Sequence, residues 1–196
     1  MEKKKKWTGE KPSAEQLRRE LHRERYNKKY GNVLKSTVGM LVVVAACAVL
    51  VATIFMPVLQ IYGNSMTPTL NENEIVVSLK GSSYERGDIV GFYYGNKLLI
   101  KRCIGRPGEW INIDEEGNVY INKEKLDEPY LVEKAFGDCD LELPYQVPDG
   151  KWFLMGDHRS TSVDSRNSVM GCVADEQMVG RIVFKIWPLT EFGPLE

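Results

Sequence analysis

Metal-binding and paired-cysteine motifs are absent from this 196-residue chain. It holds 2 histidines and 4 cysteines, with no Cys-x-x-Cys pair and no cysteine–histidine spacing typical of a metal centre. The sequence therefore predicts neither a bound metal nor another cofactor. Cys47 lies in an apolar run, so Cys103, Cys139 and Cys172 remain outside it. One disulfide plus one thiol, or three thiols, fit this count equally well.

Charged residues are missing from residues 36–71. Within this stretch Val38–Leu59 is almost continuously apolar, and 22 residues at 1.5 Å each span the roughly 30 Å hydrocarbon core of a bilayer. We therefore expect one transmembrane helix over residues 37–59, with Pro57 at its exit. A buried core helix is disfavoured by the lack of a polar face, and a cleaved signal peptide by the 35-residue basic lead.

The charges that are present are unevenly distributed. Residues 1–36 carry 12 Lys/Arg against 5 Asp/Glu, whereas residues 37–196 carry 14 against 22. A basic segment before an apolar span is typical of the cytoplasmic side. We expect a single-pass protein of the plasma membrane, with a cytoplasmic arm over 1–36, an extracytoplasmic domain over 60–196 and the lipid bilayer as a partner. No nucleic-acid motif accompanies the arm, so no nucleic-acid partner is expected.

Two further patterns predict secondary structure. Ser13-Ala14-Glu15-Gln16 is a capping box that predicts a helix through Lys29, ending at Gly31, although a solvated linker fits as well. After residue 60, short runs rich in β-branched and aromatic residues are separated by turn formers. The expected strands are Glu74–Lys80, Asp88–Tyr94, Leu98–Ile104, Trp110–Asp114, Val119–Asn122, Trp152–Met155 and Val179–Trp187. The fold class is therefore mainly β: an antiparallel β-sheet domain preceded by one transmembrane α-helix, with an irregular excursion over Leu126–Gln146.

Ser65 and Lys101 are the candidate reactive residues. Ser65 follows Gly63 in a turn sequence, where glycine permits unusual φ and close approach of a substrate backbone. Lys101 lies within an apolar strand and, by alternation, shares a face with Leu99 and Cys103. Burial would lower the lysine pKa from about 10.4 and leave a neutral amine that can take a serine proton. A structural turn serine and a solvent-facing edge lysine are the ordinary alternatives.

A third segment, Gly156–Arg166, is dense in charged and hydroxyl residues and follows a predicted strand. It could form a hydrogen-bonded loop beside the site, or an exposed turn. A Ser-His-Asp triad would need His158 as its base, because His22 lies on the other side of the apolar run. Asp157 or Asp164 could then orient that histidine.

Together the segments resemble the type I signal peptidases, membrane-anchored Ser-Lys proteases. The motifs occur in the family's order over residues 60–173: Ser65-Met66-x-Pro68-Thr69-Leu70, Gly87-Asp88-Ile89-Val90, Lys101-Arg102-x-Ile104-Gly105-x-Pro107-Gly108 and Gly156-Asp157-x-Arg159-x-x-Ser162-x-Asp164-Ser165-Arg166. The single anchor and short excursion look like the compact Gram-positive form. The resemblance implies cleavage of signal peptides from exported preproteins through an acyl-enzyme.

The resemblance also implies residue roles. Ser65 would be the nucleophile, Lys101 the base and Ser162 the hydroxyl that orients the lysine. Asp164 and Arg166 would brace the site, together with Arg102. The positions that match shallow pockets for Ala-x-Ala substrates are Ile61, Met66, Leu70, Val90, Leu99 and Ile100.

Two positions depart from the family pattern. Gly63 stands where some members carry a serine that helps the oxyanion hole, which leaves the backbone N–H of Ser65 as the main expected donor. His158 stands where an asparagine is usual, and its role stays open. Two rival functions are a non-catalytic signal-peptidase-like chaperone for pilus or secretion assembly, and a soluble self-cleaving Ser-Lys repressor. Both reactive residues are present, which disfavours the first, and the apolar span disfavours the second.

Overall fold

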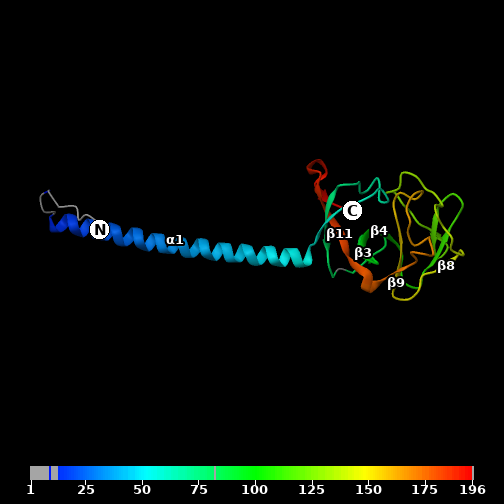
Figure 1. Ribbon diagram of the computed structural model, residues 1–196, viewed down its shortest axis with the longest axis horizontal. Helices are drawn as coiled ribbons and strands as arrows, with labels where there is room; N and C mark the ends of the chain where they lie inside the picture. The colour runs from blue at the N-terminus through cyan, green and yellow to red at the C-terminus, as the bar shows by residue number, and fades with distance from the viewer. Residues whose placement is uncertain (1–8, 10–12, 82, 196) are drawn as a thin grey trace. The chain divides into compact units, whose positions relative to one another are not determined.

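The structure is a computed structural model that describes residue 9, residues 13–81 and residues 83–195. Its first element is a single helix, α1, over Ala14–Phe55 (Figure 1). The capping box is confirmed: the Ser13 N–H donates to Gln16 Oε1 at 2.9 Å, and the Gln16 N–H donates to Ser13 Oγ at 3.3 Å. Residues 1–8 and 10–12 of the expected basic arm lie outside the described residues.

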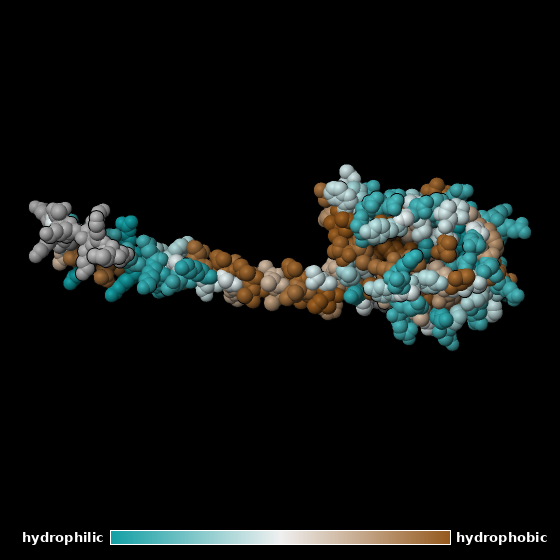
Figure 2. Space-filling view, viewed as in Figure 1, coloured by the Kyte–Doolittle hydropathy of each residue, from teal (hydrophilic) through white to brown (hydrophobic). Residues whose placement is uncertain are grey.

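The expected end of this helix at Gly31 is wrong, because α1 continues through it. One glycine in a helix interior costs only about 1 kcal/mol relative to alanine, and the long apolar run that follows offsets it. At 1.5 Å per residue, 42 residues extend about 63 Å. Figure 2 shows hydrophilic residues towards the N-terminal end of α1 and hydrophobic residues along the rest. That apolar part is long enough to cross a membrane.

The helix ends at Phe55, four residues before the expected end of the anchor. Pro57 lacks the N–H that a continuing helix needs. Val58 and Leu59, expected to be part of the anchor, belong instead to strand β1 and pair with Val77 and Val76 of β2. The β-rich part of the chain therefore begins at the proline itself.

The region after α1 is built from antiparallel strands, which confirms the expected fold class. The seven expected strands are all present, with ends that differ by at most one residue. The strands are β1 (Val58–Gln60), β2 (Ile75–Leu79), β3 (Ile89–Tyr94), β4 (Lys97–Gly105), β5 (Trp110–Ile113), β6 (Val119–Ile121), β7 (Glu124–Lys125), β8 (Tyr145–Gln146), β9 (Lys151–Met155), β10 (Val173–Ala174), β11 (Met178–Trp187) and β12 (Gly193–Pro194). Two short 3₁₀ helices cover Asp175–Gln177 and Leu189–Glu191.

The strands form two sheets. The larger has the order β1-β2-β11-β3-β4-β9-β10, with β12 paired to β11, and the smaller has the order β7-β6-β5-β8. β5 and β6 are joined by a hairpin turn, in which the Asp114 N–H donates to the Asn118 carbonyl at 3.1 Å. Leu126–Gln146 is irregular, as expected, apart from the short strand β8 at its end, which pairs with β5.

Strand β4 is central to the position of the site. It pairs with β3 and β9, so that Lys101 lies opposite Val90. Its residues from Lys101 to Gly105 are all buried, which means that both faces of the strand are covered here. The simple alternation that placed Lys101 on one inward face understates this burial, because the other face is covered as well: Ile104 packs against Ile111 and Val119. All four cysteines are free thiols, so the alternative without a disulfide holds in this structure.

Candidate active site

Ser65 lies in the turn that connects β1 to β2. Gly63 has φ +79°, a left-handed conformation that favours glycine. The turn is closed by Thr67, whose N–H and hydroxyl both donate to the Asn64 carbonyl, at 3.1 and 2.9 Å. Met66 and Leu70 are buried on either side of the turn and anchor it in the core. The turn thus holds the serine at the surface of a packed element.

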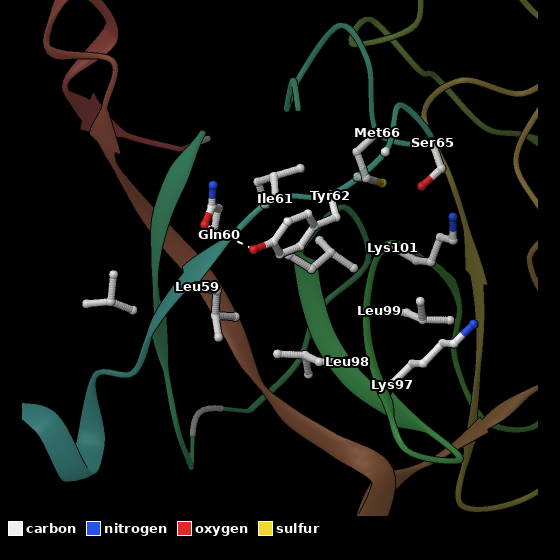
Figure 3. Close-up of a pocket in the computed structure, with 13 residues that line it drawn as sticks. Leu59, Gln60, Ile61, Tyr62, Ser65, Met66, Lys97, Leu98, Leu99 and Lys101 are labelled. Carbon is white, nitrogen blue, oxygen red and sulfur yellow. Dashed lines mark hydrogen bonds between the residues drawn. The ribbon is translucent and has the colours of Figure 1, made fainter. Parts of the chain in front are cut away.

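Lys101 reaches the same place from β4. Its side chain is only 4% exposed, and its Nζ donates to the Ser162 hydroxyl at 2.9 Å. Ser65 and Lys101 line the same two clefts. Figure 3 shows the hydroxyl oxygen of Ser65 and the terminal nitrogen of Lys101 directed towards each other. The fold therefore brings Ser65, Lys101 and Ser162 together from three separate segments.

The electrostatic setting of Lys101 favours its neutral form. Burial lowers the pKa of Lys101 from 10.5 to about 8. The Asp164 carboxylate opposes this shift and the Arg166 guanidinium adds to it. The like charge that acts on the amine is thus that of Arg166. Neighbouring Arg102 instead binds the Asp157 carboxylate.

A loop over residues 156–166 closes against the serine turn. The His158 N–H donates to the Ser65 carbonyl at 3.1 Å, and Asp157 accepts the Thr69 hydroxyl at 2.5 Å. Asp157 also accepts two hydrogen bonds from Arg102, at 2.9 and 2.6 Å. The buried Arg102–Asp157 pair joins the strand of Lys101 to the loop, and the bond from Thr69 joins the serine turn to the same loop. These contacts behind the site fix the position of Ser65 relative to Lys101.

Asp164 and Arg166 form the centre of that loop and have no exposed surface. Arg166 donates to both carboxylate oxygens of Asp164, at 2.8 and 2.9 Å, and to the carbonyls of Phe136 and Arg159. Burial alone would raise the pKa of Asp164, but the bonds from Arg166 and from the Gly156 N–H lower it overall. Removal of either partner would leave a buried charge unpaired, at a cost of about 3–5 kcal/mol.

Ser162 lies in the same loop and, within the described part of the chain, is the one hydrogen-bond partner of the lysine amine. It is 2% exposed, and its N–H donates to the His158 carbonyl at 3.0 Å. We expect Ser162→Ala to lower kcat on the order of 10- to 1000-fold, with a smaller effect on KM, because the amine loses the group that directs it. The measurement is steady-state cleavage of a peptide with Ala at −1 and −3. An unchanged kcat would contradict a positioning role for Ser162.

Gly156 is a site residue that sequence reasoning did not single out. A Cβ at this position would collide with the Ser162 hydroxyl and with the Ser65 carbonyl oxygen. Only glycine allows the loop and the serine turn to approach this closely. The dense polar loop was visible in the sequence, but the crowding arises from contacts between segments about 90 residues apart, which one sequence does not reveal.

We therefore expect Gly156→Ala to reduce kcat/KM by about 100-fold, the loss that follows from a displacement of about 1 Å in a reacting group. Gly193→Ala is the matched control, because a Cβ there meets nothing within 4 Å and should leave activity unchanged. Circular dichroism and the thermal unfolding midpoint would show whether each variant folds. Full activity of a folded Gly156→Ala protein would contradict this role.

Next to Ser65 and Lys101 lies a cleft of about 620 Å³ between the β1 segment and β4. Four of the expected pocket residues line it, namely Ile61, Met66, Leu99 and Ile100. Leu70 and Val90 do not line this cleft; both are completely buried in core clusters, so they could shape it only from behind. A smaller cleft of about 310 Å³ lies between Leu99, Tyr94 and the segment around Val169.

A helix long enough to cross a membrane, followed by a β-sheet domain in which a serine and a buried lysine line the same cleft, fits a peptidase of the serine type with a membrane anchor. The sequence pattern of the signal peptidase family, peptidase S26, matches residues 34–187. The chain belongs to this family.

Two relatives found by sequence comparison agree with this assignment. The chain is 36% identical to a signal peptidase I of Bacillus licheniformis, over 84% of this chain and 94% of the relative. It is 30% identical to a signal peptidase I of Streptococcus pneumoniae, over 84% of this chain and 98% of the relative. A crystal structure of a signal peptidase I from Enterococcus faecalis aligns with 28% identity and a TM-score of 0.45, over 51% of this chain and 97% of that one.

Proposed function

We propose that this protein is a signal peptidase I that cleaves signal peptides from exported preproteins with Ser65 as nucleophile and Lys101 as general base. One observation carries the proposal: the Lys101 amine is buried, has its pKa lowered to about 8, and is held by Ser162 beside Ser65 in a shared cleft. A serine hydroxyl needs such a base, because it is a weak nucleophile at neutral pH.

The reaction follows from these groups. Neutral Lys101 accepts the proton of the Ser65 hydroxyl while Oγ attacks the scissile carbonyl carbon. The resulting ammonium then gives that proton to the leaving amine, and an acyl-enzyme on Ser65 remains. Lys101 next takes a proton from the water that attacks the ester, and returns it to Ser65 Oγ as the signal peptide leaves. Lys101 Nζ thus accepts or donates the proton in every step.

The developing oxyanion would be stabilised by the backbone N–H of Ser65. Within the described part of the chain this N–H has no intramolecular acceptor, so it is free to donate. Gly63 supports that role only through its backbone, since φ +79° shapes the turn and it has no side-chain donor. Donors fixed in advance are worth about 3–4 kcal/mol of transition-state stabilisation in acyl transfer.

The substrate class follows from the clefts on either side of Ser65. Ile61, Met66, Leu99 and Ile100 give the larger cleft an apolar lining, which suits the small residues of an Ala-x-Ala site. The apolar part of α1 would anchor the protein in the plasma membrane, and the basic residues before it favour a cytoplasmic N-terminus. The β domain would then work on the outer surface, where signal peptides emerge from the bilayer.

The test is cleavage of a purified preprotein by the purified full chain in detergent micelles, followed by N-terminal sequencing of the product. We expect one cut directly after the Ala-x-Ala segment. A matched preprotein with Phe at −1 should remain intact, because the proposed specificity requires a small residue at that position. A protein that binds the preprotein without cutting it would instead fit the non-catalytic chaperone.

A further inference from the structure

A cleft of about 690 Å³ that neither Ser65 nor Lys101 lines opens on the other face of β4. Successive residues of a strand point to opposite faces, so Arg102 lines this cleft while Lys101 lines the catalytic ones. Three arginines, Arg86, Arg102 and Arg181, lie in its wall, with Asp88 as the one lining carboxylate. The remaining lining residues are mainly apolar: Gly87, Ile89, Pro129, Tyr130, Ile182, Val183, Pro194 and Leu195.

Arg102 contributes positive potential while most of its N–H donors are already engaged. Its guanidinium binds Asp157 through two nitrogens, donates to the Gly87 carbonyl at 2.7 Å, and lies 3.9 Å from the centre of the Tyr130 ring. Arg102 is therefore a fixed cation in the wall of the cleft, because its bonds to Asp157 hold it against the loop behind the active site.

Arg86 and Arg181 are bound less completely. Arg86 donates through Nη2 to Glu109 at 2.5 Å, and Arg181 donates through Nη1 to Asp88 at 3.4 Å. The Nε–H group of each is buried and has no partner among the described residues. Their side chains are 30% and 41% exposed, so each guanidinium can turn towards the cleft. Such a turn breaks no hydrogen bond at Nε, and it exchanges the Nη contacts with Glu109 and Asp88 for contacts with a ligand.

We propose that this cleft binds an oxyanion of the phosphate class between Arg86 and Arg181. Guanidinium groups recognise such anions through paired N–H donors, and an occupied cleft would satisfy the two Nε groups that now lack partners. Planar guanidinium groups with paired N–H donors match the oxygens of an oxyanion and favour it over spherical chloride. The same chemistry occurs in free phosphate and in the headgroup of an anionic phospholipid, whose apolar part would contact Ile182 and Leu195.

Asp88 offers a substitution that should strengthen anion binding. Its carboxylate is the only lining group that repels an anion, and it holds Arg181 through a long 3.4 Å contact. Its other oxygen accepts the Glu85 N–H at 2.8 Å, a bond that the side-chain oxygen of asparagine can also accept. Asp88→Asn therefore removes the competing charge and keeps the turn, and it should strengthen anion binding.

The experiment is a calorimetric titration of the purified full chain, in uncharged detergent micelles, with inorganic phosphate at constant ionic strength set by chloride. We expect saturable binding at one site. Arg86→Gln and Arg181→Gln should each weaken it at least 10-fold, and Asp88→Asn should tighten it several-fold. Arg106→Gln is the matched control, because Arg106 is exposed and does not line the cleft. The readout is binding, so it does not depend on cleavage.

Thermal unfolding would show that each variant is folded. Arg181→Lys, which keeps the charge but lacks Nε–H, serves as a second, milder variant and should still bind more weakly than the wild type. Lipid nanodiscs distinguish the source: loss of phosphate binding in phosphatidylglycerol but not phosphatidylcholine discs assigns the site to headgroups, and binding unchanged in both assigns it to free phosphate. Binding no stronger than that of chloride, or equal affinity in Arg181→Gln and wild type, would overturn the proposal.

Discussion

Replacement of Ser65 by alanine is expected to abolish preprotein cleavage, with a fall in kcat/KM on the order of 10³-fold or more. The substitution removes the one oxygen that can form the acyl-enzyme, and no other hydroxyl lies both in the turn and beside Lys101. The measurement is the rate of preprotein processing by purified protein, followed on gels and by mass spectrometry of the released product.

The fold should survive this change, because the Ser65 side chain makes no hydrogen bond within the described residues. The thermal unfolding midpoint should therefore match that of the wild type. Ser160→Ala is the matched control: it makes the same chemical change at an exposed position of the neighbouring loop and should leave activity intact. Processing above a few per cent of the wild-type rate by Ser65→Ala would remove Ser65 from the role of nucleophile.

Much of the fold could be predicted from local patterns. The uncharged stretch predicts a membrane-length helix and the β-branched runs predict seven strands, because both signals depend on residues close together in sequence. The short strands β1, β7, β8, β10 and β12 were missed, since two or three residues carry no periodicity. The helix end was placed too early at Gly31, where a local stop signal gave way to the apolar run that follows.

Site residues could be predicted from the sequence where the chemistry of the residue type suggests its role. They could not be predicted where the role depends on how deeply the side chain is buried. Ser65 and Lys101 stand out because a turn serine and a lysine in an apolar strand are each unusual. Leu70 and Val90 were assigned to a pocket, but the packing around them leaves no exposed surface. Gly156 was quoted within a motif but given no role, because its role is to leave space, which appears only when the loop meets the serine turn.

The surroundings of Lys101 must meet two requirements at once. It needs burial to lose its proton, and it needs a polar partner so that the buried amine is not left unsatisfied. Ser162 provides that partner at 2.9 Å, while the Asp164–Arg166 pair lies behind it and affects the lysine pKa in opposite directions. The brace thus holds the loop in place without a net charge that would recapture the proton.

Replacement of Lys101 by methionine should abolish cleavage as completely as Ser65→Ala, because methionine keeps most of the stem and removes the base. Lys101→Arg should fail as well, since a guanidinium does not lose its proton near neutral pH. The loss of one hydrogen bond to Ser162 should lower the free energy of unfolding by only about 1 kcal/mol. Circular dichroism checks that the variants fold, and activity in either folded variant would contradict the assignment.

The pH dependence of the wild-type enzyme tests the same nitrogen without a mutation. Only neutral Lys101 is active, so kcat/KM should rise about tenfold per pH unit below a pKa of about 8 and level off above it. A shift from 10.5 to about 8 raises the neutral fraction at pH 7 from about 10^−3.5 to about 10^−1, or roughly 300-fold. His158→Asn should leave this acid limb in place. An acid limb near the ordinary histidine value of about 6.5 that vanishes in His158→Asn would instead identify His158 as the base.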